Sequence, residues 1–581
     1  MSQALAISIG QWSEKGRKDI NQDFHGAMTP AGTLLALKGV AVALADGISG
    51  SAVSNVASES AVKAFLTDYY ATSETWSVKT AGQRVIAAAN SWLHGQTRRG
   101  THPYEPDKGY VCTFTALVIK GDTAHVFHVG DSRVYRLNAA GLEQLTDDHR
   151  IRLSSHQVYL GRALGVNPHV EIDYRMVQVQ PDDLFILATD GVHEYAAPQS
   201  LLDAFGAHRT DLDEAARKLV QAAYEAGSPD NLTVQVVRID ATPDEGAREW
   251  LDDMPDLPPA PLLQPGSPFE GYEIIRQLHA SSRSHVYLAV EPETATRIAL
   301  KVPSTELKND PAALKRFMME EWIARRINSP NVLKPRPRLR PRAYLYLPTE
   351  FIEGQTLTQW MADHPAPSLQ AVRDIVKQIA NGLRAFHRLD MLHQDLRPDN
   401  IMIDRMGTAK IIDFGSTRIA GIAEAAPASG PDVPLGTVQY MAPEYLLDGS
   451  GTEQSDLFSL GVITYQMLTG RLPYGAAMAR VRSKAALRKV TYTSASSEGR
   501  AGDRPIPAWI DGALRRAVHP DPARRHEAIS EFIYELQHPN PAYTGAKNRP
   551  LMERNPLAVW QTLVGLLVCV IIWLATRQLR P

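Results

Sequence analysis

The first 240 residues alternate between short apolar runs and segments with helical spacing. Continuous apolar runs that end at Gly or Asp are typical of buried strands. Five such runs are GVAVALAD, YVCTFTALVIKG, TAHVFHVGDS, DDLFILATD and LTVQVVRID. Two longer segments, SAVSNVASESAVKAFLTDYY and TAGQRVIAAANSWLHG, predict helices. The pattern therefore predicts an α+β domain with a substantial sheet core over residues 1–240.

A second pattern begins at residue 269 and continues to about residue 538. The runs YEIIRQL, HVYLAV and RIALKV predict strands, and a helix is expected near 311–328. The rest is largely helical. One segment carries an apolar stripe at helical spacing, formed by Val372, Ile375, Val376, Ile379, Leu383 and Phe386. Between the two regions, residues 241–268 are acidic and rich in Pro, which predicts a semi-extended linker.

The last part of the chain is strongly apolar. The run LAVWQTLVGLLVCVIIWLAT, residues 557–576, contains no charged residue. About 20 apolar residues match the thickness of a bilayer's hydrocarbon core. Trp560 and Trp573 lie near its ends, where interfacial aromatic residues are expected. A buried core helix is the alternative. We expect a single-pass C-terminal anchor in the cytoplasmic membrane, preceded by a juxtamembrane segment over 539–556.

Composition and charge limit the class of protein. A length of 581 residues implies more than one domain, and 44% hydrophobic with 22% charged residues is typical of a globular chain. The formal net charge of −3 provides no global basic field, so no nucleic-acid partner is expected. The two cysteines, Cys112 and Cys569, cannot form a disulfide framework, which favours a reducing compartment.

The first region places aspartates beside its predicted strands. Asp46, Asp131 and Asp190 each follow an apolar strand, Asp230 precedes one, and Asp23 lies in NQDF. A single Asp-Gly at a strand end is usually a turn, but several in one domain suggest carboxylates that converge at one sheet edge. Their hard oxygens suit Mg²⁺ or Mn²⁺ better than Zn²⁺. Two such ions can activate a water for in-line attack on phosphorus.

The second region carries residues suited to phosphoryl transfer. HQDLRPDN spaces Asp395 and Asn400 so that one side chain can serve a hydroxyl and the other a metal, although the octapeptide alone also fits a polar turn. Asp413, before Phe-Gly, can hold a hard cation. Lys301 ends the apolar run RIAL, and Glu320 follows nineteen residues later on a predicted helix. A lysine held by a glutamate can contact phosphates as a point charge.

These motifs, in this order, resemble a eukaryotic-type serine/threonine protein kinase of bacteria over residues 269–538. GTVQYMAPE, SDLFSLGV and DPARR continue the match. The resemblance implies that Lys301 contacts the phosphates of ATP and pairs with Glu320. It also implies that Asp395 orients the substrate hydroxyl, while Asn400 and Asp413 hold one or two Mg²⁺ or Mn²⁺ ions.

Further details follow from the same resemblance. Glu444 and Arg525 are expected to form a structural ion pair, and Arg397 to keep a positive charge near the transferred phosphate. Two departures stand out. The three positions of the family's Gly-rich loop hold His279, Ser281 and Ser284, and Gln394 replaces the usual Arg before the catalytic Asp. Side chains in that loop should weaken the cover over the phosphates, so slow kinase activity is expected.

Residues 1–240 resemble the metal-dependent serine/threonine protein phosphatases of type 2C. The match rests on NQDF, ADGISG, CTFTALV, HVGDSRVYRL, QLTDDH, RALG, FILATDGV and SPDNLTV. The resemblance implies two or three Mg²⁺ or Mn²⁺ ions. Asp46 would bridge two of them, assisted by the carbonyl of Gly47, and Asp190 and Asp230 would complete the first set.

The remaining positions of that match are less regular. Asp23 would bind metal directly or through water, and Asp131 would serve a third, weaker ion. The family's phosphate-binding Arg falls on Lys18, with Arg17 beside it, so either could hold phosphate. His193, three residues after Asp190, is expected to be structural.

The sequence thus predicts an α+β multidomain chain. A β-sandwich with flanking helices is followed by a bilobal kinase-like domain and a transmembrane helix. The expected function is bifunctional, with phosphorylation of protein Ser/Thr by ATP and hydrolysis of phospho-Ser/Thr. The expected partners are protein substrates and, through the C-terminal helix, a lipid bilayer. Both catalytic domains would face the cytoplasm. The alternatives are an active phosphatase with a nucleotide-binding pseudokinase, or a membrane scaffold without activity.

Overall fold

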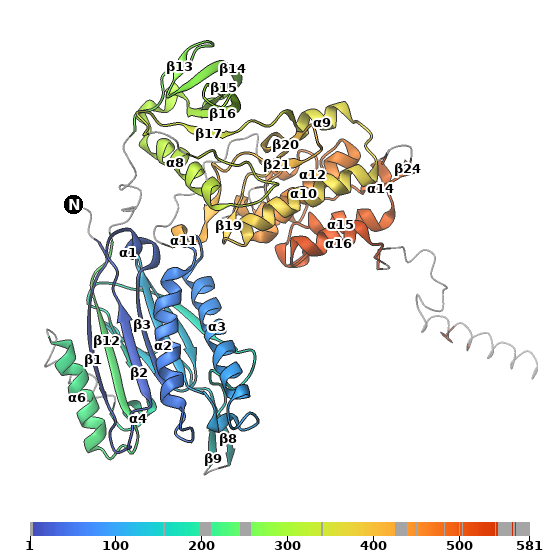
Figure 1. The fold of residues 1–581 in the computed structure, drawn as a ribbon. Coiled ribbons are helices and arrows are strands. Elements are labelled where there is room, and N and C mark those ends of the chain that lie inside the picture. The colour runs from blue at the N-terminus through green and yellow to red at the C-terminus, as the bar shows by residue number, and fades with distance from the viewer. Residues whose placement is uncertain are drawn as a thin grey trace, which may run out of the picture. The chain divides into compact units, whose positions relative to one another are not determined.

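The computed structural model divides the chain into two compact units (Figure 1). The first comprises Met1–Leu257 with Arg388–Met391 and Arg418–Pro431, and the second comprises the rest. The residues that the structure describes are 4–154, 157–197, 211–243, 257–337, 341–424, 438–447, 451–481, 483–498, 500–501, 504–540, 542–543, 560–561 and 564.

The first 257 residues contain two five-stranded antiparallel sheets, ordered β1-β12-β11-β6-β7 and β10-β5-β4-β3-β2. A separate hairpin joins β8 to β9. The strands are β1 (Ala6–Glu14), β2 (Asp23–Met28), β3 (Val40–Asp46), β4 (Phe114–Lys120), β5 (Thr123–Val129), β6 (Arg133–Asn138), β7 (Gly141–Gln144), β8 (Arg150–Ser154), β9 (Gln157–Leu160), β10 (Asp173–Gln178), β11 (Leu184–Ala188) and β12 (Leu232–Ala241). The helices are α1 (Gly32–Lys38), α2 (Ser54–Ala71), α3 (Val78–Arg99), η1 (Pro106–Lys108), α4 (Asp190–His193) and α6 (Leu212–Glu225).

The two sheets form a sandwich that helices cover on its outer faces, as Figure 1 shows. Between the sheets, Leu44 of β3 packs in one core with Leu187 of β11 and Val237 of β12. The helices α2 and α3 contribute to a second core with β3, β4 and β5, and α6 contributes to a third with β11 and β12. Because both faces of β4 and β5 are covered, every residue of these strands is buried, which explains their continuous apolar runs.

The predicted elements of this domain are confirmed, and local signals fix several helix ends. The five apolar runs form β3, β4, β5, β11 and β12, and the two longer segments form α2 and α3. Helix α3 begins after Ser77, whose side chain accepts a hydrogen bond from the Thr80 backbone N–H. Asp211 accepts one from the Glu214 N–H at the start of α6. Such caps satisfy amide groups that have no partner inside the helix.

The rest of the chain begins with a five-stranded antiparallel sheet, β13-β14-β15-β16-β17, followed by a mainly helical part with a small sheet, β18-β20-β21. The strands are β13 (Pro268–Phe269), β14 (Tyr272–Ala280), β15 (Ser284–Glu291), β16 (Thr296–Pro303), β17 (Leu347–Glu350), β18 (Gly354–Thr356), β19 (Met391–Leu392), β20 (Ile401–Asp404), β21 (Ala409–Ile411), β22 (Arg418–Ile419), β23 (Arg500–Ala501) and β24 (Arg504–Pro505). The helices are η2 (Thr305–Asn309), α8 (Pro311–Arg326), α9 (Leu357–Asp363), α10 (Leu369–His387), η3 (Pro398–Asn400), α11 (Ala420–Ala423), η4 (Pro443–Leu447), α12 (Glu453–Thr469), η5 (Met478–Arg480), α13 (Lys484–Leu487), α14 (Ala495–Glu498), α15 (Ala508–Ala517), η6 (Pro522–Arg524) and α16 (Ile529–Gln537).

The predicted strands and the helix near 311–328 are present as β14, β15, β16 and α8. The predicted apolar stripe is the buried face of α10, and all six of its residues are buried. Ala260 and Leu263, inside the predicted linker, are buried in one core with Phe269 and Tyr272. Residues 244–256 of that linker lie outside the described residues.

The predicted transmembrane helix requires a correction. No helix in the part of the chain that the structure describes combines the length and apolar character needed to cross a membrane. Most of the run 557–576 lies outside the described residues, and the described Trp560 and Val564 are exposed. An apolar composition is necessary for a membrane span, but a span also needs a continuous helix of about 20 residues. Over the residues that the structure describes, the fold class therefore consists of the sandwich and the bilobal domain, with no helix that could span a membrane.

Candidate active sites

The acidic residues of the N-terminal domain lie at the ends of strands from both sheets. Asp23 begins β2 and Asp46 ends β3, and the two residues are direct partners across the antiparallel pair. Asp190 begins α4, immediately beyond β11, and Asp230 precedes β12. Asp131 lies between β5 and β6. The expected convergence of carboxylates at one edge is therefore observed.

Burial and the repulsion of neighbouring carboxylates raise the pKa values of Asp46, Asp23 and Asp190. For Asp46, burial is the larger cause, and Asp23, Asp190, Asp131 and Asp230 add to it, so its pKa lies well above the ordinary value. Burial raises the pKa of Asp23 to about 6, with a smaller contribution from Asp230. Burial, followed by the charges of Asp131 and Asp230, raises the pKa of Asp190 to about 7. A shielded group of like charges requires cations if all of its members are to be ionised.

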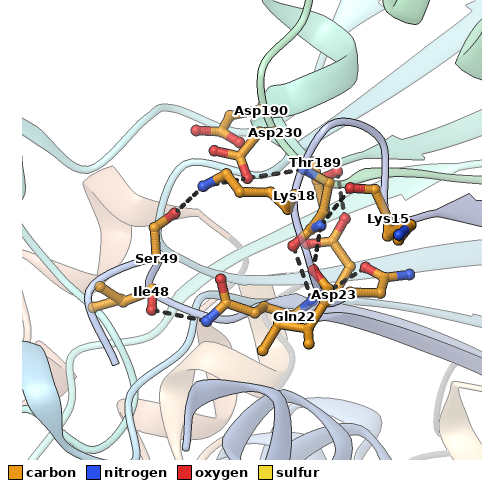
Figure 2. Close-up of polar contacts among 12 residues, drawn as sticks. Lys15, Lys18, Gln22, Asp23, Ile48, Ser49, Thr189, Asp190 and Asp230 are labelled. Carbon is orange, nitrogen blue, oxygen red and sulfur yellow. Dashed lines mark hydrogen bonds and ion pairs between the residues drawn. The ribbon is translucent and has the colours of Figure 1, made fainter. Parts of the chain in front are cut away.

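The two neighbouring basic residues Lys18 and Arg17 are placed differently. Lys18 Nζ lies 3.2 Å from Asp230 Oδ1 and donates to Ser49 Oγ at 2.8 Å (Figure 2). The Arg17 guanidinium instead donates to the carbonyls of Ser228 and Tyr224, and it stacks over the Tyr224 ring. Lys18 is therefore the one of this pair that faces the acids.

The residues around these acids fit a hard divalent cation. Thr189 Oγ1 donates to Asp23 Oδ2 at 3.0 Å, whereas Asp23 Oδ1 is buried without a hydrogen-bond partner. Among the described residues, no three His, Cys, Asp or Glu side chains are already arranged as a metal-binding group. Two of the carboxylates are instead engaged with other side chains: Asp23 accepts a hydrogen bond from Thr189, and Asp230 pairs with Lys18. The oxygen-only donors and the orphan oxygen fit Mg²⁺ or Mn²⁺.

Gly47 follows Asp46 in a crowded backbone environment. A Cβ at this position would meet Ser54 O at 2.7 Å and Gln22 O at 2.9 Å, so a larger residue would displace the chain beside the acids. Gln22 Nε2 donates to Ser51 O at 3.0 Å and to Ser54 Oγ at 2.5 Å, close to the start of α2. Gln22 thus supports the backbone near Gly47 rather than facing the acids.

Sequence reasoning missed three residues of this site. Asn231 Oδ1 accepts from the Gln22 N–H, and its Nδ2 donates to the carbonyls of Lys15 and Ile20. Thr189 bonds Asp23, as described above. Arg150, from β8, contacts Asp131 at 2.7 Å and Asp190 at 3.4 Å. Asn231 and Thr189 stand next to two of the predicted ligands, which is a usable signal, but nothing in the sequence near Arg150 indicates this contact.

In the C-terminal domain, Lys301 is the centre of the predicted phosphate site. Lys301 Nζ, on β16, donates to both oxygens of Glu320 on α8, at 2.6 and 2.7 Å, and lies 3.4 Å from Asp413 Oδ1. Burial alone would lower the pKa of Lys301, but Asp413 and Glu320 outweigh it and hold that pKa above its ordinary value. Burial likewise favours a raised pKa for Asp413, but Lys301 lowers it to about 2.

The catalytic loop, residues 393–400, is held in place by Asp456 of α12. Asp456 accepts from the backbone N–H of His393 at 2.9 Å and of Gln394 at 3.0 Å. Gln394 has a φ of 65°, a left-handed conformation that these bonds hold in place. The substituted Gln394 therefore still serves the loop through its backbone.

This loop presents Asp395 and Asn400 together. Asn400 Nδ2 donates to Asp395 O at 2.9 Å and to Asp395 Oδ2 at 3.3 Å, while Asp395 Oδ1 is buried without a hydrogen-bond partner. Burial raises the pKa of Asp395. The Ile412 N–H donates to Asn400 O at 3.0 Å, which places Asn400 beside the strand end that carries Asp413. The predicted set of Asp395, Asn400 and Asp413 is thus brought together.

Three further predicted residues, Arg397, Glu444 and Arg525, have defined places. Arg397 Nε lies 4.0 Å from Asp399 Oδ2, in the turn that follows Asp395. The fully buried Arg525 makes two bonds of 2.7 Å to the Glu444 carboxylate, and its guanidinium lies over the Phe458 ring. The second pair has the position and burial of a structural ion pair.

The loop between β14 and β15 is closed by its own side chain. Ser281 N donates to Ser284 O at 3.0 Å, and Ser281 Oγ accepts from the backbone N–H groups of Ser284 and Arg283, at 3.1 and 3.3 Å. A serine hydroxyl therefore fixes a turn at a place where the kinase pattern uses glycines.

Comparison with known proteins matches the two parts of the chain to two families. Residues 13–235 match the family model described as protein phosphatase 2C, and residues 272–541 match that of the protein kinase domain. Serine/threonine-protein kinase PrkC of Bacillus subtilis is 28% identical over 270 residues, which are 46% of this chain and 40% of the relative. Serine/threonine-protein kinase Pkn1 of Myxococcus xanthus is 31% identical over 321 residues, 52% of this chain and 44% of the relative. The chain spans less than half the length of these two relatives.

Solved structures resemble each part separately. The catalytic domain of the phosphatase PstP, in complex with two manganese ions, is 26% identical, with a TM-score of 0.35, and the match covers 41% of this chain and 100% of that solved domain. The PknI kinase domain of Mycobacterium tuberculosis is 28% identical, with a TM-score of 0.37, and the match covers 48% of this chain and 99% of that solved domain.

Two classes of enzyme domain are thus joined in one chain. Residues 13–235 carry a phosphatase domain of the 2C type, and residues 272–541 carry a serine/threonine protein kinase domain. These classes imply ATP for the second domain and Mg²⁺ or Mn²⁺ for both.

Proposed function

We propose that the chain is a bifunctional enzyme that phosphorylates protein Ser/Thr with ATP and hydrolyses phospho-Ser/Thr. The observation that supports the proposal is the presence of two groups of polar residues, one in each domain. One is the group of strand-end carboxylates around Asp46, and the other is the Lys301 site with Asp395. The group around Asp46 has too few positively charged side chains to balance its carboxylates, whereas the second group already contains a fixed cation, Lys301.

In the phosphatase domain, Asp46 and the Gly47 carbonyl would hold two metal ions jointly. Asp190 and Asp230 would complete the first ion's ligands, and Asp23 would bind directly or through water. When bound, two Mg²⁺ or Mn²⁺ ions would lower the pKa of a shared water and stabilise its in-line attack on phosphorus. Lys18, now paired with Asp230, would then be available to bind oxygens of the substrate phosphate.

In the kinase domain, Lys301 would position the phosphates of ATP, held in place by Glu320. Asp395, whose pKa burial raises, would orient and accept the proton of the substrate hydroxyl. Asn400 and Asp413 would hold one or two Mg²⁺ or Mn²⁺ ions. Arg397 would keep positive charge near the transferred group. The substrates of both domains would be proteins located in a compartment that contains ATP.

A second candidate is an active phosphatase with a pseudokinase domain that binds nucleotide without transferring phosphate. The observation that favours it is the turn closed by Ser281, because its hydroxyl occupies backbone N–H groups that a glycine loop would leave free for phosphate.

One experiment separates the two proposals. Wild type, Asp46→Ala and Asp395→Ala would be incubated with γ-labelled ATP, Mn²⁺ and a generic basic protein. We expect label to accumulate in Asp46→Ala above the wild type and to be absent in Asp395→Ala. If wild type and Asp46→Ala incorporate no more label than Asp395→Ala, the kinase is rejected and the pseudokinase is favoured. Equal label in wild type and Asp46→Ala would count against the phosphatase.

A further inference from the structure

The Arg150 side chain occupies the space between the acids on one side of the phosphatase site. Arg150 is the first residue of β8, and its Nε donates to Asp131 Oδ2 at 2.7 Å. Its Nη2 lies 3.4 Å from Asp190 Oδ2, and its Nη1 donates to Glu194. One guanidinium therefore contacts three carboxylates, and its side chain is only 27% exposed.

The backbone before Arg150 is anchored beside Asp131. The His149 N–H donates to Gly130 O at 2.8 Å, and the Gly130 N–H donates to His149 Nδ1 at 3.0 Å. His193 Nε2 lies 2.9 Å from Asp131 O on the other side. Because the segment is fixed next to Asp131, a long side chain at position 150 reaches the acids without ordering a distant loop. This lowers the conformational entropy that the ion pairs must overcome.

A divalent ion bound by Asp131 and Asp190 would have to share these oxygens with the guanidinium. Two cations a few ångströms apart repel strongly where water is partly excluded. The guanidinium also offers several donors in a planar arrangement that suits carboxylates, so it satisfies these oxygens without a metal. The ion that the sequence assigns to Asp131 and the observed Arg150 contact are therefore alternatives.

We propose that Arg150 takes the place of a third divalent ion between Asp131 and Asp190. The phosphatase domain would then bind two ions, at the Asp46 side, and carry a built-in cation at the third position. This inference rests on the proposed metal-dependent phosphatase function and specifies its metal content. Asp131 would act as a positioning residue for Arg150 rather than as a metal ligand.

The test counts Mn²⁺ ions per full-length chain, without nucleotide, from the free Mn²⁺ signal in electron paramagnetic resonance during titration of metal-free protein. The ions lost in Asp46→Asn define the phosphatase site. We expect two such ions in the wild type and an unchanged count in Asp131→Asn. Arg150→Gln should gain one ion, and the double variant Arg150→Gln/Asp131→Asn should lose it again.

Arg162→Gln is the matched control. Arg162 also bridges two acids, Glu171 and Asp173, but neither belongs to the site, so its count should equal that of the wild type. Loss of an ion in Asp131→Asn, or no gain in Arg150→Gln that circular dichroism shows to be folded, would overturn the proposal. If Arg150→Gln does not fold, the Asp131→Asn comparison decides alone. If the wild type binds no ion that depends on Asp46, the proposed phosphatase function fails instead.

Discussion

Asp46 in the phosphatase domain and Asp413 in the kinase domain follow the same local pattern with opposite electrostatic results. Each lies at the end of an apolar strand and just before a glycine-containing turn. The pKa of Asp46 lies well above its ordinary value, because burial and four other aspartates oppose its charge. The pKa of Asp413 falls to about 2, because the positive charge of Lys301, 3.4 Å away, outweighs the effect of burial.

The difference comes from residues that are distant in the sequence. Lys301 and Glu320 bring a fixed cation to Asp413 from β16 and α8, whereas the strands around Asp46 bring further carboxylates. The Asp413 side chain keeps 42% exposure, so solvent weakens the effect of Lys301 without reversing it. We therefore expect the phosphatase site to depend on cations from solution, whereas the kinase site already holds Lys301 next to two of its acids.

The largest expected effect on activity follows from removing the Asp46 carboxylate at the centre of the phosphatase site. Asp46→Asn should lower phosphate release from a phosphoprotein by at least about 10³-fold, an increase of about 4 kcal/mol in the barrier. Asp240→Asn, which breaks a pair with Arg238 away from the site, should leave the rate within about twofold. Steady-state phosphate release measures both variants, and comparable rates in the two would contradict the importance of Asp46.

Removing the fixed cation should instead reduce stability. Lys301→Met leaves Glu320 and Asp413 without their cation, and breaking a buried pair in this way costs about 3–5 kcal/mol. Lys410→Met, which breaks a more exposed pair with Glu350, should cost about 1 kcal/mol or less. The measurement is thermal unfolding of the full chain, following the transition that ATP and Mg²⁺ raise in the wild type. Equal losses in both variants would show that Lys301 is not special.

Asp23 and Asp190 of the phosphatase site should contribute to the pH dependence of stability with the opposite sign to Asp413 of the kinase site, whereas Glu320, whose pKa burial raises to about 7, shares the sign of the first two. The folded pKa values of Asp23, about 6, and Asp190, about 7, exceed the ordinary 3.8. Between about pH 4 and pH 7 the folded domain thus binds more protons than the unfolded chain, and its free energy of unfolding falls as pH rises. Mn²⁺ relieves the repulsion that appears at high pH, so it should raise the melting temperature more at pH 7.5 than at pH 5, by at least about 3 °C.

Asp413 gives the contrasting sign in the same experiment. Its pKa is lowered from 3.8 to about 2, so its contribution to stability is present above pH 4 and is lost only as pH falls toward 2. Asp413 should therefore cause no fall between pH 5 and pH 7.5 in the melting temperature of the unfolding transition that ATP shifts upward. A Mn²⁺ effect of equal size at both values of pH would contradict the electrostatic account of the phosphatase site.

The smallest expected effect concerns the loop that Ser281 closes. Ser281→Ala removes a hydroxyl that accepts two backbone bonds, each with a net value of about 0.5–1.5 kcal/mol. We expect the KM for ATP to change by about 2- to 10-fold while Asp395-dependent turnover persists. Ser267→Ala, whose hydroxyl donates to the Gln264 carbonyl in another turn, serves as the control and should leave KM unchanged. An identical KM in all three proteins would show that the closed turn does not affect ATP.

The sequence by itself determined the elements and most of the chemistry. Continuous apolar runs identify β3, β4, β5, β11 and β12, because covered strands need side chains that are apolar on both faces. The carboxylates and the residues around Asp395 follow from spaced motifs, since these groups must lie at strand ends and in one loop. At residues 557–576 apolar composition predicted a membrane span, but most of that run lies outside the described residues, and no described helix could cross a membrane.

In the phosphatase site, only the tertiary structure decided which basic side chains meet the acids. Lys18 and Arg17 are adjacent and chemically similar, yet Lys18 faces Asp230 and Arg17 is held by the carbonyls of Ser228 and Tyr224. Arg150 reaches Asp131 and Asp190 from a hairpin outside both sheets. Such contacts depend on side-chain directions and on elements far apart in the chain, and sequence spacing contains no information about either. The balance of charge at each site, and hence its need for metal, is therefore a property of the fold.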